Sequence, residues 1–436
     1  MKRLEPHTAA HLAQALPHIM SQQEIIKLTI EISLHQFACV FTKQTGRASK
    51  GSDQKMNSSN GETTPVIIYS KRTINEIRDC ILENYGQIKY ELPFINAVSV
   101  EIPREKLELL SANQMIGAIS EDAIVSKTPI APKARPVRIR CGNFEDDMER
   151  IFGSKERGKG VGVAVIDTGV SPHYDLVKPV NRITAFKDLL ANKELPYDDD
   201  GHGTHVAGII AGNGYTSCKY TGTAPCADII SIKALDESGN GTESDILAAL
   251  QWIINNGQLY NIRVINLSLG IKVEPPYDDD PLIKGANAAV RYGYSVITAA
   301  GNNGPGKCTI NSPGTSPLVI TVGAADLTDY DGKVKVASFS SRGPTLSGDS
   351  KPDLVAPGVD ICSLDGKNPK GYAVQSGTSM AAPVVSGVAA CLYAMRPDLT
   401  PAMVKQILVR DALPLDKEDR YAQGRGLLNY RIFTNF

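Results

Sequence analysis

From Gly160 onward the chain carries repeated apolar runs of strand length, and this pattern constrains its fold more than any other feature. The runs lack polar alternation, and helical stretches separate them. A strand that is apolar on both sides must be covered on both faces, which is typical of a parallel sheet between two layers of helices. The sequence therefore predicts an α/β fold with a doubly wound, mostly parallel sheet. The expected strands are Val161–Ile166, Ile229–Ala234, Val264–Leu269, Ser295–Ala300 and Val319–Ala324, and the expected helices include His202–Ala211, Ser244–Asn255 and Pro281–Tyr292.

Polar residues stand at the carboxyl ends of three of these runs. They are Asp167, Ser268 and Asn302. In open parallel sheets, ligands bind in the crevice outside the carboxyl ends of the strands. We therefore expect these three residues to share one edge of the sheet and to contribute to a site there.

A smaller unit precedes the sheet, at residues 65–127. Strand-like and helix-like stretches follow one another there in the order β-α-β-β-α-β, which predicts a small ferredoxin-like α+β domain whose last strand covers Met115–Val125. Residues 1–64 are expected to form an N-terminal extension with a polar linker, and residues 128–150 a proline-rich, basic tether and entry segment. The larger domain then occupies residues 151–436.

Composition argues against several classes of protein. The formal net charge of −1 is unlike that of nucleic-acid-binding proteins, which usually carry a basic excess. The longest apolar run, Pro383–Met395, is too short to span a membrane and is expected to be a buried helix. No export signal is recognisable near the N-terminus, which predicts a cytoplasmic location, with non-classical release as the alternative. The eight cysteines contain no C-x-x-C pair, so we expect reduced, mostly buried thiols.

Three short motifs supply an acid, a base and a nucleophile. Asp167 ends Ala164-Val165-Ile166-Asp167, His202 opens His202-Gly203-Thr204-His205, and Ser379 lies in Gly377-Thr378-Ser379-Met380-Ala381-Ala382-Pro383. A serine hydroxyl is a poor nucleophile at neutral pH unless a base takes its proton. An imidazole can take and return that proton when a carboxylate holds its tautomer. Taken singly, each residue also has a structural explanation, as a strand-end turn, a packed side chain or a helix N-cap.

Together the motifs, in the chain order Asp, His, Ser, resemble those of the subtilisin-like serine proteases, the subtilases. The resemblance covers roughly residues 160–396, and the chain is most similar to bacterial intracellular-type, AprX-like members. It implies that Ser379 is the nucleophile, that His202 is the general base and that Asp167 orients the imidazole. His205, one helical turn after His202, is assigned a packing role.

The segment Ala299-Ala300-Gly301-Asn302-Asn303-Gly304 resembles the part of a subtilase that stabilises the oxyanion. The resemblance implies that the Asn302 side chain and the Ser379 backbone N–H are the two donors. An ordinary turn is the alternative explanation for this asparagine.

Two other segments resemble the edges that bind substrate in this family. Ser268, Leu269 and Gly270 form one of them, and Gly239 and Gly241 belong to the other. A peptide is expected to lie between these edges as an added strand. For the second segment, an ordinary loop is the alternative.

The resemblance requires no cofactor, and we expect no metal ligands. The stretch Ala211–Gly222, where many secreted subtilisins carry a calcium loop, is poor in carboxylates, so structural calcium is not indicated. The acidic triplets Asp198–Asp200 and Asp278–Asp280 are expected to be solvated loops, with calcium binding or a preference for basic substrates as the alternatives.

The expected partners are polypeptide substrates and the chain's own N-terminal part, with no nucleic acid and no membrane. The domain at 65–127 resembles the inhibitory propeptide of the family. Our hypothesis is that residues 1 to about 140 inhibit the enzyme, assist its folding and are cut off by the enzyme between Val125 and Arg140. A non-catalytic subtilase fold that binds peptides is the alternative. The order of the motifs and the lack of a G-x-S-x-G elbow exclude an α/β-hydrolase esterase.

Overall fold

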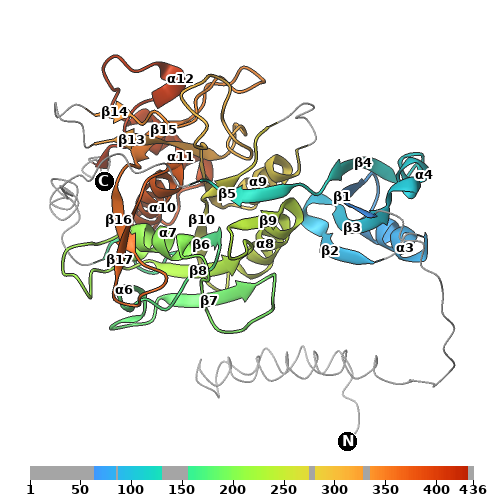
Figure 1. The fold of residues 1–436 in the computed structure, drawn as a ribbon, viewed down its shortest axis with the longest axis horizontal. Coiled ribbons are helices and arrows are strands. Elements are labelled where there is room, and N and C mark those ends of the chain that lie inside the picture. Colours follow the sequence, from blue (N-terminus) through green and yellow to red (C-terminus); the bar gives the residue numbers. More distant parts are fainter. Residues whose placement is uncertain (1–62, 85–86, 130–155, 274–279, 328–333, 431–436) are drawn as a thin grey trace, which may run out of the picture. The chain divides into compact units, whose positions relative to one another are not determined.

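The structure is a computed structural model that describes residues 63–84, 87–129, 156–273, 280–327 and 334–430 (Figure 1). The N-terminal extension up to residue 62 and the tether from residue 130 to 150 lie outside the described residues. Expectations for those segments therefore stay predictions.

The N-terminal domain, as described at residues 63–121, is a four-stranded antiparallel sheet with two helices. Its strands lie in the order β2-β3-β1-β4, and its elements follow the predicted order β-α-β-β-α-β. The first strand begins inside the segment expected to be linker. The elements are β1 (Thr63–Ser70), α3 (Ile74–Asn84), β2 (Ile88–Leu92), a 3₁₀ turn (Pro93–Ile95), β3 (Ala97–Pro103), a 3₁₀ turn (Arg104–Lys106), α4 (Leu107–Ser111) and β4 (Ile116–Glu121).

The two faces of this small sheet have different neighbours. On β1, Val66 and Ile68 face a core shared with Ile77 and Ile81 of α3. The alternate residues, Ile67 and Tyr69, join the core that contains the helices of the larger domain. Because successive side chains of a strand point to opposite faces, the sheet is buried on both sides.

The larger domain is built on an eight-stranded, mostly parallel sheet. Seven strands lie in the order β14-β13-β12-β10-β6-β8-β7, β15 pairs with β13, and β14 is the antiparallel edge. The strands that follow β6 in the chain, β7 and β8, lie on one side of it, and the later strands of this sheet, from β10 onward, lie on the other. The strand order therefore reverses beside β6. The strands are β6 (Gly162–Asp167), β7 (Ile183–Asp188), β8 (Asp228–Lys233), β10 (Ile262–Leu267), β12 (Ser295–Ala299), β13 (Ile320–Asp326), β14 (Lys335–Val336) and β15 (Leu354–Pro357).

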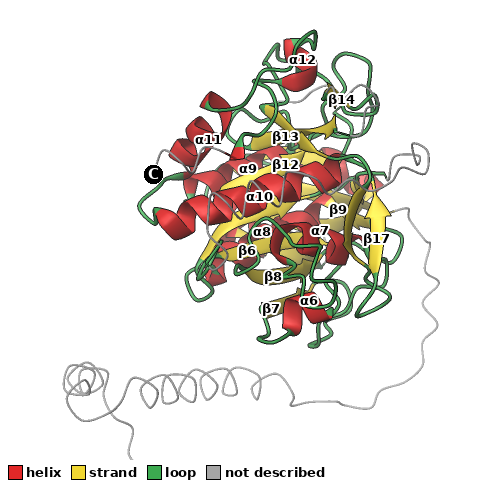
Figure 2. Cartoon of the chain, turned by 90° about the vertical axis from the view of Figure 1, so that its left-hand side faces the viewer, coloured by secondary structure: helices red, strands yellow, loops and turns green. Residues whose placement is uncertain are grey.

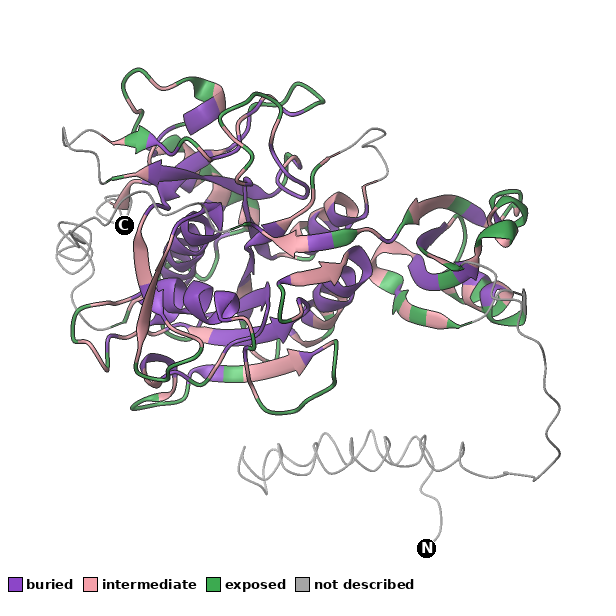
Figure 3. Ribbon diagram, in the orientation of Figure 1, coloured by how far each residue is buried: buried purple, intermediate pink, exposed green. Residues whose placement is uncertain are grey.

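Helices cover both faces of this sheet, as Figure 2 shows. Val163 and Val165 of β6 pack in the core that contains α7 and α10, whereas Ala164 and Ile166 pack in the core that contains α8 and α9. Both cores are almost fully buried (Figure 3). The predicted α/β fold is therefore confirmed. The helices are α6 (Tyr174–Val177), α7 (His202–Ala211), α8 (Glu243–Asn256), α9 (Pro281–Arg291), α10 (Thr378–Met395), α11 (Pro401–Arg410) and α12 (Arg420–Gln423).

Helix α10 lies at the centre of the larger domain. It is the one helix among the described residues that is long and apolar enough to cross a membrane, but 89% of its 18-residue window is buried inside the protein. The expected buried helix at Pro383–Met395 is confirmed, and it starts five residues earlier, at Thr378. This start places Ser379 in the first turn.

A third, small sheet joins the N-terminal domain to the larger one. Strand β5 (Ile124–Lys127) lies between β9 (Asn240–Thr242) and β11 (Leu269–Gly270), antiparallel to both. A two-stranded ribbon of β16 (Ile361–Leu364) and β17 (Tyr372–Gln375) completes the larger domain. The single strand expected at Met115–Val125 is therefore two strands, β4 and β5, which belong to different sheets.

Contacts with the larger domain cause this division. Between the two strands, Asp122 Oδ1 accepts the backbone N–H of Ser244 at 2.8 Å, and the N–H of Ala123 donates to Glu243 Oε2 at 3.4 Å. Ser244 lies in the first turn of α8, where backbone N–H groups have no partner within the helix. The carboxylate supplies one and turns the chain toward β9.

The cysteines differ in part from expectation. Cys391 is buried in the core as a thiol, and burial raises its pKa to about 12, so it is unreactive. Mostly buried thiols were expected, but among the described cysteines only Cys391 is fully buried, and Cys218 and Cys308 are thiols at the surface.

Candidate active site

The structure brings Asp167 and His202 together at the carboxyl edge of the large sheet. Asp167 ends β6, His202 is the first residue of α7, and the imidazole Nδ1 lies 2.8 Å from Asp167 Oδ1. Both side chains are buried. Burial alone lowers the pKa of His202, but the charge of Asp167 and the hydrogen bond to it outweigh burial and raise that pKa above its usual value.

Glycine at position 203 allows α7 to approach β6 this closely. A Cβ on Gly203 would lie 2.1 Å from the carbonyl oxygen of Gly169 and 3.1 Å from the Cβ of Asp167. Any larger residue would therefore push the start of α7, and with it His202, away from Asp167.

A network that was not predicted supports the start of α7. The Thr168 hydroxyl accepts the N–H of Gly203 at 3.0 Å and donates to Asp198 Oδ1 at 2.8 Å. Asp198 Oδ2 accepts both the N–H and the hydroxyl of Thr204, at 2.8 and 2.6 Å. An aspartate just before a predicted helix was the signal for this role, because such residues commonly bind the first N–H groups.

The Ser379 hydroxyl lies beside the segment Ser268–Gly270 and forms no hydrogen bond with His202. It donates to the carbonyl oxygen of Ser268 at 2.9 Å. Within the described part of the chain, the imidazole Nε2 of His202 is buried and has no hydrogen-bond partner. The ring nitrogen on the side opposite Asp167 is therefore unpartnered among these residues.

The backbone of Ser379 is also held by Ser268. Pro383 lies inside α10 and has no N–H, so it cannot donate to the carbonyl four residues earlier, which is that of Ser379. The hydroxyl of Ser268 donates to this carbonyl instead, at 3.0 Å, and itself accepts from Asn266 Nδ2 at 2.9 Å. This link between Ser268 and the first turn of α10 was not predicted.

Asn302 follows β12 and contacts the same turn of α10. Its Oδ1 accepts the N–H and the hydroxyl of Thr378, at 3.0 and 2.9 Å. These two bonds fix the amide so that Nδ2 points outward, and Nδ2 donates to the carbonyl oxygen of Pro129 at 2.5 Å. The amide predicted to bind an oxyanion thus binds a peptide carbonyl of the chain itself.

All five residues predicted to bind substrate contact the β5 segment. On one side, Leu269 pairs with Lys127 and Gly270 pairs with Ser126. On the other side, Gly241 pairs with Val125. The two remaining contacts are backbone hydrogen bonds. The N–H of Lys127 donates to the carbonyl of Gly239 at 2.8 Å, and the N–H of Thr128 donates to the carbonyl of Ser268 at 3.3 Å.

The acidic triplet Asp198–Asp200 differs in part from the expected solvated loop, because Asp199 is exposed but Asp198 is buried and Asp200 is partly buried. Asp198 is buried in the network of α7, and Asp199 accepts from Lys233 Nζ at 2.6 Å. Asp200 forms an ion pair with Lys127. In the second triplet the structure describes Asp280, which caps α9 by accepting the N–H of Ile283 at 2.9 Å. Backbone donors and lysines therefore occupy these carboxylates.

His205 packs as expected. Its Nε2 lies 3.1 Å from the carbonyl oxygen of Ala373, and burial lowers its pKa to about 3, so the ring is neutral. Across the described ranges, no group of three or more histidine, cysteine, aspartate or glutamate side chains could hold a metal ion.

Comparison with known proteins identifies the family. The sequence profile of the subtilase family matches residues 158–429. The chain is 43% identical over 302 residues to the serine protease AprX of Bacillus subtilis, an alignment that covers 64% of this chain and 66% of AprX. It is 32% identical over 357 residues to subtilisin E of the same organism, with coverage of 81% and 84%.

Solved structures share the fold. Sphericase superimposes with a TM-score of 0.55 at 30% identity, over 65% of this chain and 97% of its own. Fervidolysin from Fervidobacterium pennivorans, a keratinolytic enzyme related to subtilisin, superimposes with a TM-score of 0.69 at 24% identity. That match covers 88% of this chain and 62% of fervidolysin, and it shows the fold alone.

The comparisons also correct the expected location. Subtilisin-family relatives such as AprX and the alkaline proteases are secreted extracellular enzymes, so the prediction of a cytoplasmic enzyme is wrong. Subtilases act on polypeptides and need no catalytic cofactor. With the profile match over most of the larger domain and relatives named as serine proteases, the chain belongs to the subtilase family of serine endopeptidases.

Proposed function

We propose that this chain is a serine endopeptidase that uses Asp167, His202 and Ser379 and is made as a self-processing zymogen. The observation that carries the proposal is the position of its own segment 124–129. This segment lies as a strand between β9 and β11, and the Pro129 carbonyl accepts from Asn302. An extended peptide in this place is held as a substrate would be.

The proposed reaction begins with a rotation of the Ser379 hydroxyl. Its hydrogen bond to Ser268 breaks, and the hydroxyl turns to the open Nε2 of His202, which takes its proton as the oxygen attacks the peptide carbonyl. Asp167 accepts from Nδ1–H, so the imidazole keeps the tautomer with a free Nε2 and is stabilised when it becomes charged. His202 then protonates the leaving amine, and a water molecule hydrolyses the acyl-enzyme by the same route.

Asn302 is the proposed oxyanion donor, with the N–H of Ser379 as the second. Its amide is fixed in advance by Thr378, so no reorganisation is needed when negative charge develops on the substrate oxygen. Removing one such donor lowers kcat by about 10²- to 10³-fold in comparable sites. We expect a loss of this size in Asn302→Ala, with the fold retained.

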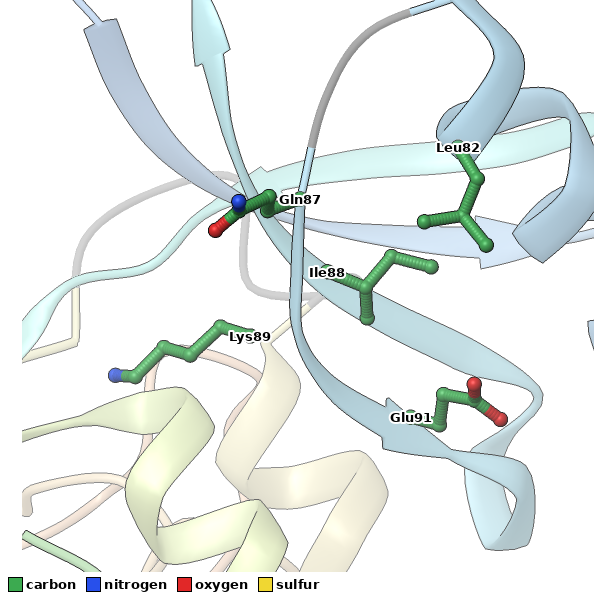
Figure 4. Close-up of a pocket in the computed structure, with 5 residues that line it drawn as sticks. All are labelled: Leu82, Gln87, Ile88, Lys89 and Glu91. Atoms are coloured by element: carbon green, nitrogen blue, oxygen red, sulfur yellow. The ribbon is translucent and has the colours of Figure 1, made fainter. Parts of the chain in front are cut away.

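The N-terminal domain is the proposed intramolecular inhibitor, and contacts at the start of α8 support this. Lys89 points away from the pocket that it lines with Leu82, Gln87, Ile88 and Glu91 (Figure 4). Its Nζ lies 3.0 Å from Asp245 Oδ1, and the Tyr90 hydroxyl donates to the same oxygen at 2.9 Å. With β5 in the space between β9 and β11, which we call the cleft, substrates are excluded until the chain is cut between Val125 and Arg140.

Labelling with a fluorophosphonate probe tests the proposed activity. The probe reacts with a serine that a base activates, so the processed chain should be labelled at Ser379, and Ser379→Ala and His202→Ala should not. Hydrolysis of casein by the same samples should follow the labelling. A folded chain that neither takes the probe nor cuts casein would instead be a peptide-binding protein without activity.

A further inference from the structure

The ion pair between Lys127 and Asp200 points to a specificity that the family assignment does not include. We propose that Asp200 and Gly239 form a subsite of the cleft that selects polypeptides with a lysine or arginine at the position that Lys127 occupies. We call this the basic position, defined as the residue whose N–H donates to the Gly239 carbonyl. The inference rests on the proposed function, because it takes β5 as the stand-in for a substrate.

The charge of the subsite comes from Asp200. Its Oδ2 contacts Lys127 Nζ, and the two side chains are only 14% and 19% exposed. The neighbouring acid, Asp199, is already paired with Lys233. Asp200 is therefore the carboxylate of the triplet that faces the cleft, and a neutral or acidic residue in the basic position would leave it without its cation.

The shape of the subsite comes from Gly239. A Cβ at this glycine would lie 2.4 Å from Cδ and 2.6 Å from Cε of Lys127. The lysine stem thus runs over the space that a side chain at 239 would fill. A side chain at 239 would force this stem to move, and the backbone there, with φ +80°, favours glycine in any case, so the present path of the lysine to Asp200 depends on Gly239.

The side chain of Asp200 also contacts the start of α7, which sets the choice of variant. Its Oδ1 accepts the N–H of His202 at 3.0 Å, at the start of α7. Asn in this position keeps an acceptor for that N–H and removes only the charge. Asp199→Asn is the matched control, because it removes a charge one residue away that does not contact Lys127.

The test compares three internally quenched peptides with the full-length chain after self-processing is complete. The peptides have the sequence Ile-Val-Ser-X-Thr-Ser-Ala-Gly, with Lys, Ala or Glu as X, and mass spectrometry locates the cut. We expect kcat/KM in the order Lys, Ala, Glu, with Lys over Ala by about 5- to 10-fold, the size of a partly buried ion pair. Asp200→Asn should bring this ratio close to one, and Asp199→Asn should not. Any effect of Asp200 through His202 is the same for all three peptides and cancels in the ratio.

A second measurement does not depend on catalysis. In the Ser379→Ala chain, hydrogen exchange of segment 124–129 is followed for Lys127→Ala, Asp200→Asn and both together. If the pair holds the segment, each single variant speeds exchange about fivefold and the double variant is no faster than either. Additive effects overturn the proposal, as does a Lys-to-Ala ratio that Asp200→Asn leaves unchanged. Failure of the proposed function looks different: no peptide is cut by any variant, and the exchange experiment alone then decides whether Asp200 binds the lysine.

Discussion

Removing the Ser268 hydroxyl should cost several kcal/mol of stability, because it leaves two buried polar groups without a partner. The Ser268 hydroxyl donates to the Ser379 carbonyl at 3.0 Å and accepts from Asn266 Nδ2 at 2.9 Å. In Ser268→Ala both groups lose this partner. A buried polar group left without a partner costs about 1–3 kcal/mol. The other end of Asn266 keeps the hydroxyl of Ser386, at 2.8 Å. We therefore expect Ser268→Ala to lower the free energy of unfolding by about 3 kcal/mol.

Pro383 offers a way to test this reasoning against simple loss of packing. In Pro383→Ala the new N–H can donate to the Ser379 carbonyl within the helix, as in any regular α-helix. The double variant Ser268→Ala/Pro383→Ala should then be about 1–2 kcal/mol more stable than the sum of the single changes predicts. Urea unfolding in the Ser379→Ala background, which prevents self-digestion, measures all four chains. Additivity within about 0.5 kcal/mol would show that the carbonyl does not depend on Ser268.

Two further predictions concern other parts of the molecule. Burial, the nearby Asp280 charge and other acids of the interface raise the pKa of Glu243 to about 8. Because the folded chain then holds this proton more tightly than the unfolded chain, docking of the 121–123 segment is most stable below pH 4.5 and weakens as the pH rises through 8. Glu243→Gln should remove this pH dependence of the unfolding free energy, which is at most about 1.4 kcal/mol per pH unit for one group. The prediction is refuted if the unfolding free energies of the parent and the variant change in parallel from about pH 5 to 9. Gly203→Ala should separate α7 from β6, destabilise the fold by about 1–3 kcal/mol and abolish probe labelling; a labelled, fully stable variant would contradict the close approach seen here.

Local patterns in the sequence predicted the large sheet well. Apolar runs such as Val161–Ile166 are buried on both faces, so burial and strand length coincide in the sequence. The edge strand β7 was not predicted, because at Ile183–Asp188 only the two terminal residues are fully buried and the strand has no continuous apolar run. The candidate residues Asp167, His202 and Ser379 could be chosen from the sequence for a different reason, because each lies in a motif of a few neighbouring positions.

Contacts between distant segments could not be predicted in the same way. The division between β4 and β5 depends on Asp122, which binds the N–H of a residue 122 positions later in the chain. The Ser379 hydroxyl binds a backbone carbonyl, and a carbonyl is present at every residue and leaves no mark in the sequence. The role of Asp200 was open for the same reason, because an acidic triplet in a loop does not reveal which cation it faces.

The most direct test of the central claim is the intact mass and N-terminal sequence of the purified chain beside Ser379→Ala, after identical expression. If Ser379 is the nucleophile and segment 124–129 lies in the cleft as a substrate, the parent chain should yield a fragment whose first residue lies between about Ser126 and Cys141. Ser379→Ala should stay at 46.9 kDa. The same fragment from both chains, or full-length protein from both, would contradict a self-processing protease.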